Sequence, residues 1–553
     1  MQEQTYKKHK FLMQGSILAI AGIFVRIIGL LYRIPMVNII GTRGNGYYTS
    51  AYGVYSLFLI LSSYTFPAAI SKIISQRLAS GRLKDVKNVI KYSFILAIVV
   101  GLITSLIMYF GADMISFLHR KPYLKFALRA LAPTLFIMSI LGILRGIFQG
   151  MGNMVPTAVS QIFEQIANAI TSLIFAFILF NRGKIANIIY DSEEYSYAFG
   201  AEGGAIGTGI GAFVALVFLT LMLIKLQSKF KRFIENNNNY RPETAPEIYG
   251  VLFSTIVPIV IASTIYNLTT VVDDLIFSNA LTFMKSELNI VVLWGVFGNY
   301  HLLFNIPVAV ASSLTSSIIP SISASVAQND VREVVLKVKY SVKYAMLIVV
   351  PAFVGLFVLA DPICRVLFRE HLDMLISMLR AGSIAVVFFS YATVTNGILH
   401  GLGLYNLPLK NAVIALVVHI AAMIGMLLLN LNIYAVVYGM IVFAIVLSVL
   451  NQRDINRIVR YRNSKFQRRY ILTFSLMFMS AGLMGVATYF TNRFLIKFFA
   501  NNDSFFMLVT RLVVCIVIGG FVYSFFVIML GVVRKRDAQY IPFISKFSIF
   551  LRG

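Results

Sequence analysis

The chain reads ISQRLASGRLKDVKNVIKYS at residues 74–93 and ISASVAQNDVREVVLKVKYS at residues 322–341. The two segments align without gaps, with seven identities in twenty positions and an offset of 248 residues. A second pair reads RALAPTLFIMSILGILRGIFQGMG at 129–152 and RAGSIAVVFFSYATVTNGILHGLG at 380–403, again with seven identities, at an offset of 251. Because the order and spacing of the two pairs are preserved, the sequence predicts an internal duplication.

Long apolar runs surround these repeated segments. The 553 residues are 58% hydrophobic and 13% charged, with a mean hydropathy of +0.81, and a soluble protein could not bury that much apolar surface. Runs of about 20 residues, the length that crosses a bilayer, occur about fourteen times. Their extents are 11–31, 47–70, 90–110, 126–146, 157–181, 202–226, 250–272, 292–319, 344–360, 378–400, 408–430, 432–451, 470–490 and 507–532. The sequence therefore predicts an all-α polytopic membrane protein.

The duplication also predicts how these helices are grouped. The repeat offset spans six predicted helices, an even number, so both copies have the same orientation in the membrane and are related by an axis along its normal. We expect a first six-helix lobe at residues 1–232 and a second at 233–455. Two extra C-terminal helices and a tail follow at 456–553. Two such lobes would enclose a central cavity.

The basic residues predict the orientation of the chain. A net charge of +26 would suggest nucleic acid in a soluble protein, but here lysine and arginine lie between apolar runs, where they act as topology signals. No nucleic-acid partner is expected. If the N-terminus is inside, about two thirds of the 48 basic residues fall on the inner side. We therefore expect a multi-pass protein of the bacterial plasma membrane with cytoplasmic termini. The loop with Arg120, Lys121 and Lys125 is an exception, because it is basic and yet predicted to be outside.

Two short stretches add to this pattern, GIFVRIIGL from Gly22 to Leu30 and QGMGN from Gln149 to Asn153, which Pro156 follows. With six, six and two predicted helices, the whole chain resembles the multidrug/oligosaccharidyl-lipid/polysaccharide exporter superfamily, and within it the MurJ- and SpoVB-like branch. The resemblance implies a flippase that moves the polyprenyl-pyrophosphate-linked peptidoglycan precursor, lipid II, from the inner to the outer leaflet by alternating access. Its implied partners are this anionic lipid-linked sugar and membrane lipids, and it leaves cell-wall synthesis machinery open as a further partner.

Three alternative functions stay open. The chain could carry another lipid-linked polysaccharide or teichoic precursor, act as a cation-coupled drug antiporter, or serve as a scaffold for division or sporulation without transport. Drug antiporters of the superfamily usually lack tail helices and have acidic cavities, so Arg26 and residues 470–532 count against that function. We expect neither an enzyme nor a cofactor, because the glycine-rich segment Gly41–Gly46 lacks the lysine-serine ending of a P-loop and no metal-ligand spacing occurs. The membrane potential or a monovalent cation would supply the energy.

Three arginines of the first predicted helix and its outer end are candidate substrate-binding residues. Arg26 lies near mid-depth, where a charge must be paired or hydrated, and its guanidinium can donate two parallel hydrogen bonds to a phosphate. The resemblance implies that an arginine of this helix lines the central cavity, and a structural salt bridge is the alternative. Arg33 lies two turns further on nearly the same face, and Arg43 follows at the outer end. For these two, snorkelling to the interface is the alternative.

The fifth predicted helix carries a candidate gating or ion-coupling residue, Glu164, on a polar stripe. The stripe consists of Gln161, Glu164, Gln165, Asn168 and Ser172, at helical spacing. Because lipid exposure of this face would be costly, it must face the bundle or a wet cavity. Hydrogen bonding between helices is the alternative to ion coupling.

Two adjacent acids near the end of the seventh predicted helix are further gating or ion-coupling candidates, Asp273 and Asp274. The offset of 248 places Asp274 at the position equivalent to Arg26. We hypothesise that Asp274 and Arg26 face one cavity and pair when no substrate is bound. A solvated helix end is the alternative.

The eighth predicted helix supplies two more substrate-binding candidates, Asn299 and His301, before a helix-kinking Pro307. The resemblance implies an acid and an arginine here and an arginine on the second helix. This chain departs from that pattern, since residues 48–71 carry no charge and the eighth helix carries only His301. The histidine could supply partial positive charge or be an ordinary bundle residue.

Overall fold

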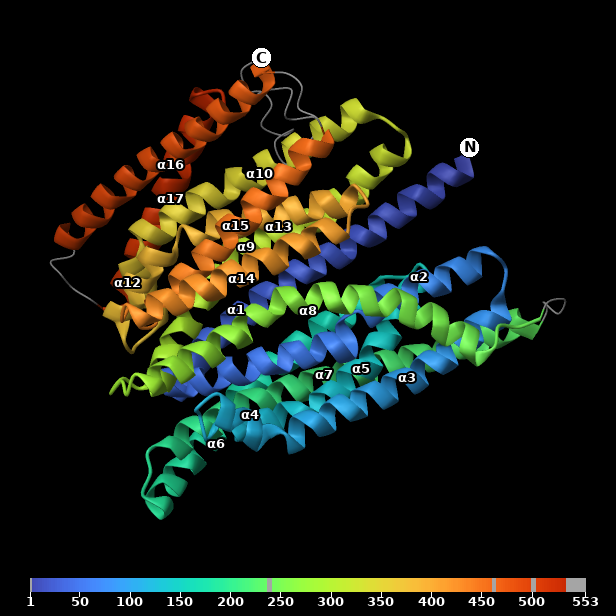
Figure 1. Cartoon of the computed structure of the whole chain (residues 1–553), viewed down its shortest axis with the longest axis horizontal. Coiled ribbons are helices and arrows are strands. Elements are labelled where there is room, and N and C mark those ends of the chain that lie inside the picture. The colour runs from blue at the N-terminus through green and yellow to red at the C-terminus, as the bar shows by residue number, and fades with distance from the viewer. Residues whose placement is uncertain (1, 236–240, 460–463, 499–503, 534–553) are drawn as a thin grey trace. The chain divides into compact units, whose positions relative to one another are not determined.

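A computed structural model describes residues 2–235, 241–459, 464–498 and 504–533, and no strand occurs among them. The prediction of an all-α polytopic protein is confirmed (Figure 1). The chain forms two compact units, Met1–Gly298 and Asn299–Gly553. The units divide within a helix, inside the eighth predicted span at 292–319. The predicted lobe boundaries at 232 and 455 rest on the repeat and stay a prediction.

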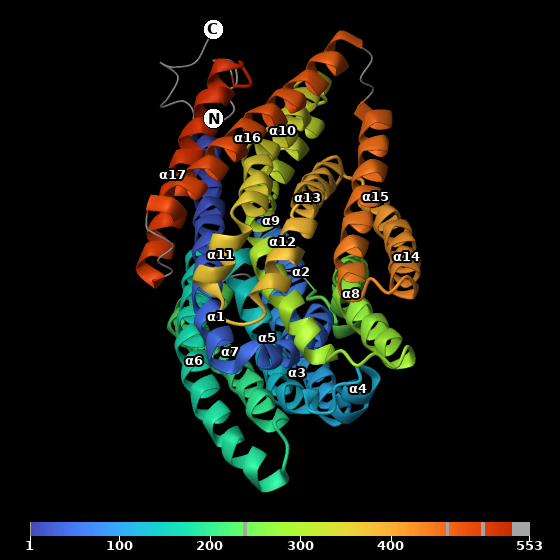
Figure 2. The ribbon, with the colours of Figure 1, turned by 90° about the vertical axis from the view of Figure 1, so that its left-hand side faces the viewer.

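The first unit contains eight α-helices, one π-helix and the start of a ninth α-helix among its described residues. They are α1 (Gln2–Leu59), η1 (Ile60–Tyr64), α2 (Phe66–Ala79), α3 (Leu83–Phe110), α4 (Ala112–Leu118), α5 (Leu124–Gly150), α6 (Val155–Tyr190), α7 (Glu194–Glu235), α8 (Ala245–Phe283) and α9 (Ile290–Ala327). Within this unit α1 packs against α5, α6 and α7 (Figure 2). We call the end of this unit that carries α4 the outer end, following the predicted orientation.

The second unit contains the rest of α9 and a run of helices that ends with a packed pair. These helices are α10 (Val331–Val358), α11 (Ala360–Leu367), α12 (Leu372–Gly382), α13 (Ala385–Gly401), α14 (Asn406–Leu428), α15 (Tyr434–Val459), α16 (Ser464–Phe498) and α17 (Phe505–Met529). The last two helices pack against each other and against α10 and α11. Tyr523 Oη donates to the Leu347 carbonyl at 2.9 Å, and Arg511 lies 3.8 Å from Asp361. These contacts fix α17 on the second unit.

Eleven helices among the described residues are long and apolar enough to cross a membrane, and a twelfth crosses if α12 and α13, bent by 49°, form one span. The predicted number of fourteen stays a prediction. The first two predicted spans lie in one helical run, Ala21–Ala79, and α8 contributes only a shorter apolar segment, Ala245–Ile261.

A single glycine breaks the long helix α1. Gly41 has φ 69° and ψ 174°, a conformation that is essentially restricted to glycine. The predicted spans 11–31 and 47–70 leave residues 32–46 as the connection between them, but these residues are helical on both sides of the break. The reason is packing, since Thr42 and Asn45 are buried, and a helix is the simplest way to satisfy a buried backbone.

Small residues let α9 approach α1 closely in the first unit. A Cβ on Gly295 would lie 1.9 Å from the Thr42 carbonyl oxygen, and a Cβ on Gly46 would lie 2.1 Å from the Val291 carbonyl oxygen. Asn45 Nδ2 also donates to the Gly295 carbonyl at 3.0 Å. At these two glycines no larger side chain fits between the helix backbones.

Replacing Gly295 with alanine is therefore expected to destabilise the protein by about 1–3 kcal/mol, because the added methyl must push the two backbones apart. Thermal unfolding of the purified protein in detergent measures the change. Gly250→Ala is the matched control, because that helical glycine has nothing within 4 Å of an added Cβ, and alanine there should be neutral or stabilising. Equal melting temperatures for the two variants would contradict the close approach.

Candidate functional site

The first unit contains a group of polar and aromatic side chains on α1, α5 and α6 that we call the headgroup cluster. It consists of Arg33, Tyr48, Tyr52, Arg145 and Glu164. The Arg33 guanidinium carbon lies 5.1 Å from the Tyr48 ring centre and 5.8 Å from that of Tyr52, and the two rings stack at 5.8 Å. Within the described ranges no carboxylate lies within ion-pair distance of Arg33. The two rings stabilise its charge.

The other predicted arginine of this helix face, Arg26, has an exposed side chain. It lies seven residues before Arg33, two turns along α1. Arg26 is therefore not enclosed by protein packing. That Arg26 and Arg33 share one face of α1, and that they bind substrate, both stay predictions.

The polar stripe of α6 makes contacts to three neighbouring helices. Asn168 Nδ2 donates to Tyr32 Oη at 3.3 Å, and Ser172 Oγ donates to the Gly204 carbonyl of α7 at 3.1 Å. Glu164 pairs with Arg145 of α5, with Nη2 and Oε2 2.5 Å apart. The alternative of hydrogen bonding between helices thus describes Asn168 and Ser172.

Arg145 is the member of the cluster that sequence reasoning missed. It lies at the inner end of the predicted span 126–146, and an arginine there is easily taken as a topology signal. Its side chain is only 10% exposed. Arg145 lies inside an apolar run, and a charge in such a run indicates a functional or paired residue, as it does for Arg26.

A second polar group closes the outer end of the first unit, and we call it the Asp274 triad: His119, Lys121 and Asp274. Asp274 Oδ1 lies 2.5 Å from Lys121 Nζ, and Oδ2 lies 2.9 Å from His119 Nδ1. Their side chains are at most 2% exposed. Lys121 also donates to Ser50 Oγ at 2.7 Å and lies 4.9 Å from the Trp294 ring centre. The triad therefore joins α1, the α4–α5 connection, α8 and α9.

The triad corrects two hypotheses about the seventh predicted helix. Asp274 does not pair with Arg26, because Lys121 and His119 hold both of its oxygens. The alternative of a solvated helix end is also wrong, because Asp273 and Asp274 are 2% and 1% exposed. Sequence spacing could not reveal the true partners, which lie more than 150 residues away.

The same contacts account for the basic loop that the charge rule places outside. Burial lowers the pKa of the Lys121 ammonium, and the adjacent Asp274 carboxylate opposes this shift. Arg129 and Lys125 lie 2.5 Å and 3.3 Å from Asp113, while Arg120 Nε donates to Asn279 Oδ1 at 2.9 Å. These basic side chains have polar or acidic partners within the protein, so they are weak topology signals.

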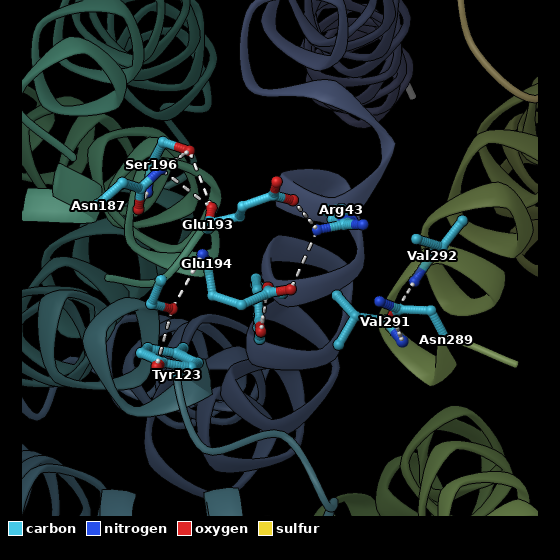
Figure 3. A network of polar contacts seen from close by, with 11 residues as sticks. Arg43, Tyr123, Asn187, Glu193, Glu194, Ser196, Asn289, Val291 and Val292 are labelled. Atoms are coloured by element: carbon cyan, nitrogen blue, oxygen red, sulfur yellow. Dashed lines mark hydrogen bonds and ion pairs between the residues drawn. The ribbon is translucent and has the colours of Figure 1, made fainter. Parts of the chain in front are cut away.

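Arg43 belongs to a separate polar network at the outer end (Figure 3). Its Nη1 lies 3.3 Å from a carboxylate oxygen of Glu193 and 3.3 Å from one of Glu194. Tyr47 Oη donates to Glu194 at 2.8 Å. Figure 3 shows Arg43 pointing from α1 toward both glutamates, of which Glu193 lies in the α6–α7 turn and Glu194 is the first residue of α7. In this structure Arg43 joins α1 to the α6–α7 turn and lies outside the headgroup cluster.

Asn299 and His301 belong to the second unit. Asn299 is buried. His301 Nδ1 lies 3.0 Å from Asn305 Nδ2 one turn later, and its ring stacks on Phe304 at 5.9 Å. The histidine thus has the partners of an ordinary bundle residue, and a role of either side chain in binding substrate stays a prediction.

Comparisons with known proteins identify the family. The sequence profile of the family described as "Polysaccharide biosynthesis protein" matches residues 11–326. The lipid II flippase MurJ of Bacillus subtilis (strain 168) is 24% identical, over 96% of this chain and 97% of that protein. The stage V sporulation protein B of the same organism is 28% identical, over 47% of this chain and 50% of that protein.

Solved structures support the same fold. The structure of lipid II flippase MurJ in an inward closed conformation matches with a TM-score of 0.60, at 17% identity, over 93% of this chain and 98% of that one. An inward-facing MATE family transporter of the MOP superfamily matches with a TM-score of 0.63, at 18% identity, over 80% and 100%. These relatives are transporters and not enzymes. The chain is a multi-pass bacterial membrane protein that belongs to the polysaccharide biosynthesis protein family and has the fold of the multidrug/oligosaccharidyl-lipid/polysaccharide exporter superfamily, as its sequence resemblance implied.

Proposed function

We propose that the protein is a flippase for a lipid-linked anionic saccharide, with lipid II as its substrate, and that the diphosphate of this lipid binds at Arg33 and Arg26. The observation that carries this proposal is Arg33, a half-buried guanidinium on an apolar helix that lies on two tyrosines and has no carboxylate beside it within the described ranges. A permanent cation in such a place requires a counter-ion or water. A diphosphate supplies that counter-ion, because it accepts paired hydrogen bonds from guanidinium.

A cavity of about 810 Å³ in the second unit fits the lipid part of the substrate. It lies among α10, α13, α15 and α16, and we call it the unit-2 cavity. Its wall is mostly apolar, with Phe388, Phe474 and Phe478 among its lining residues, while Arg453 and Arg457 line it at the end of α15. An apolar wall with cations at one end suits an amphiphile that has a long hydrocarbon tail and an anionic head.

Filling this cavity is expected to impair transport. Val449 lines the cavity and is 60% exposed, so Val449→Trp should obstruct a lipid tail at a cost of about 1–3 kcal/mol, which slows translocation about 5- to 150-fold. Translocation of lipid II in reconstituted vesicles measures the rate. Val513→Trp is the matched control, because Val513 on α17 is 52% exposed and does not line this cavity. If both variants transport equally well, the cavity does not hold the tail.

The energy of transport follows from charge. Moving the anionic headgroup outward is favoured by an inside-negative potential, at about 2.3 kcal/mol per charge per 100 mV. This direction assumes cytoplasmic termini, which the distribution of basic residues favours. Loss of transport on collapsing the potential with a potassium ionophore would support this energy source, and unchanged transport would argue for ion coupling.

Depletion of the protein in cells is the experiment that tests the function. A lipid II flippase predicts that lipid II accumulates on the cytoplasmic face, where an externally added probe or enzyme cannot reach it. Accumulation of a different polyprenyl-linked saccharide would redirect the substrate assignment. If no lipid-linked precursor accumulates and Arg33 can be removed without effect, the protein is a scaffold.

A further inference from the structure

The ion pair between Arg145 and Glu164 joins α5 to α6 inside the first unit. Arg145 Nη2 lies 2.5 Å from Glu164 Oε2, and the two side chains are 10% and 23% exposed. Arg145 Nε also donates to Ser160 Oγ at 3.3 Å. Glu164 lies nine residues into α6, about 13 Å along its axis. The pair is thus well inside the helix bundle, and the Glu164 side chain remains partly exposed.

The contacts between α6 and α1 place this ion pair near Arg33. A Cβ on Gly29 of α1 would lie 3.1 Å from Gln165 Nε2 of α6, and Asn168 Nδ2 donates to Tyr32 Oη at 3.3 Å. Gly29 and Tyr32 lie within four residues of Arg33 on α1, and Gln165 and Asn168 lie within four residues of Glu164 on α6. A diphosphate has two anionic groups and can engage more than one guanidinium.

We propose that Arg145 is a second anion-binding residue of the headgroup cluster, and that Glu164 occupies it until a substrate diphosphate displaces the carboxylate. This inference rests on the proposed function and names a further residue of the same site. The displaced carboxylate stays close to the bound anion and repels it. Such competition keeps the affinity moderate, as translocation requires, because a carrier must release its substrate as well as bind it.

Binding of farnesyl diphosphate to the full-length protein in detergent tests this inference, with uncharged farnesol as the reference ligand. Glu164→Gln should tighten binding of the diphosphate about tenfold, because it removes the competitor, and Arg145→Gln should weaken it about tenfold. The double variant should bind like Arg145→Gln alone. Opposite effects of the two single variants are the signature of competition.

A purely structural ion pair predicts a different result. Both single variants would then weaken binding alike, through lost packing, and the double variant would recover affinity. That outcome would overturn the inference. Glu202→Gln is the matched control, since Glu202 is an acid of α7 without an ion-pair partner in the described ranges, and binding should stay unchanged. If Arg145→Gln fails to fold, Arg145→Lys keeps the charge but loses the paired hydrogen bonds and should weaken binding by a smaller factor.

The same experiment separates this inference from the proposed function. If binding of farnesyl diphosphate depends on Arg33 but not on Arg145 or Glu164, the inference fails and the flippase assignment stands. A different result would separate the two in the other direction. The Glu164→Gln protein would then bind inorganic pyrophosphate as tightly as farnesyl diphosphate, and this binding would depend on Arg145 but not on Arg33. In that case Arg145 is an anion site that Glu164 occupies, and the lipid-carrier function fails. No diphosphate binding in either protein overturns both.

Discussion

Replacing Asp274 with asparagine is expected to lower the free energy of unfolding by about 3–5 kcal/mol, because the change leaves a buried ammonium without its counter-ion. Lys121 is 0% exposed at its side chain and lies 2.5 Å from the Asp274 carboxylate. The remaining partner of its charge is the Trp294 ring, and the Ser50 hydroxyl supplies a neutral hydrogen bond. Neither replaces a carboxylate. Thermal unfolding of the purified protein in detergent should show a large fall in melting temperature.

Two further variants make this prediction specific. Asp113→Asn is the matched control, because Asp113 also has two basic partners but is 56% exposed, and its loss should cost less than about 1 kcal/mol. Adding Lys121→Met to Asp274→Asn should restore most of the lost stability, since it removes the unpaired charge. If Asp274→Asn is no more harmful than Asp113→Asn, the triad is not a buried ion pair.

Replacing Arg33 with glutamine is expected to slow translocation of lipid II about 10- to 100-fold, because the variant loses charge-assisted hydrogen bonds to the diphosphate. The fold should be little affected, since the lost contacts are those of a cation with the rings of Tyr48 and Tyr52, worth about 0.5–1 kcal/mol each. Arg33→Lys should recover only part of the rate, because an ammonium cannot donate two parallel hydrogen bonds. Reconstituted vesicles with the purified variants give the rates.

A comparable arginine in the second unit serves as the control for this variant. Arg493 on α16 also lies over a tyrosine, 5.6 Å from the Tyr489 ring centre, but it lies outside the headgroup cluster and does not line the unit-2 cavity. Arg493→Gln should therefore transport at close to the normal rate. Equal loss in the two variants would show that a stacked arginine, and not the headgroup cluster, is what the transporter needs.

The helical architecture and the family were predictable because they depend on local properties of the chain. Hydropathy over about 20 residues marks a membrane helix wherever it occurs, and the repeat at residues 74–93 and 322–341 is visible without any structure. The polar stripe around Glu164 and the guanidinium groups of α1 were visible for the same reason, since a charge in an apolar run is costly in any fold. The helical connection between the first two predicted spans was not predictable, because its glycines indicate that a helix can break but not that burial restores the helix directly after the break.

The partners of these charges depend on contacts between distant parts of the chain. Asp274 pairs with Lys121 at a separation of 153 residues, and Arg145 meets Glu164 across two helices. Periodicity along one helix specifies the face on which a side chain lies, but it contains no information about which helix packs against that face. Residue spacing therefore located the costly charges of this protein, and only the packing of α1, α5, α6 and α8 determined which of them pair with an opposite charge within the described residues and which, as at Arg33, lie on aromatic rings instead.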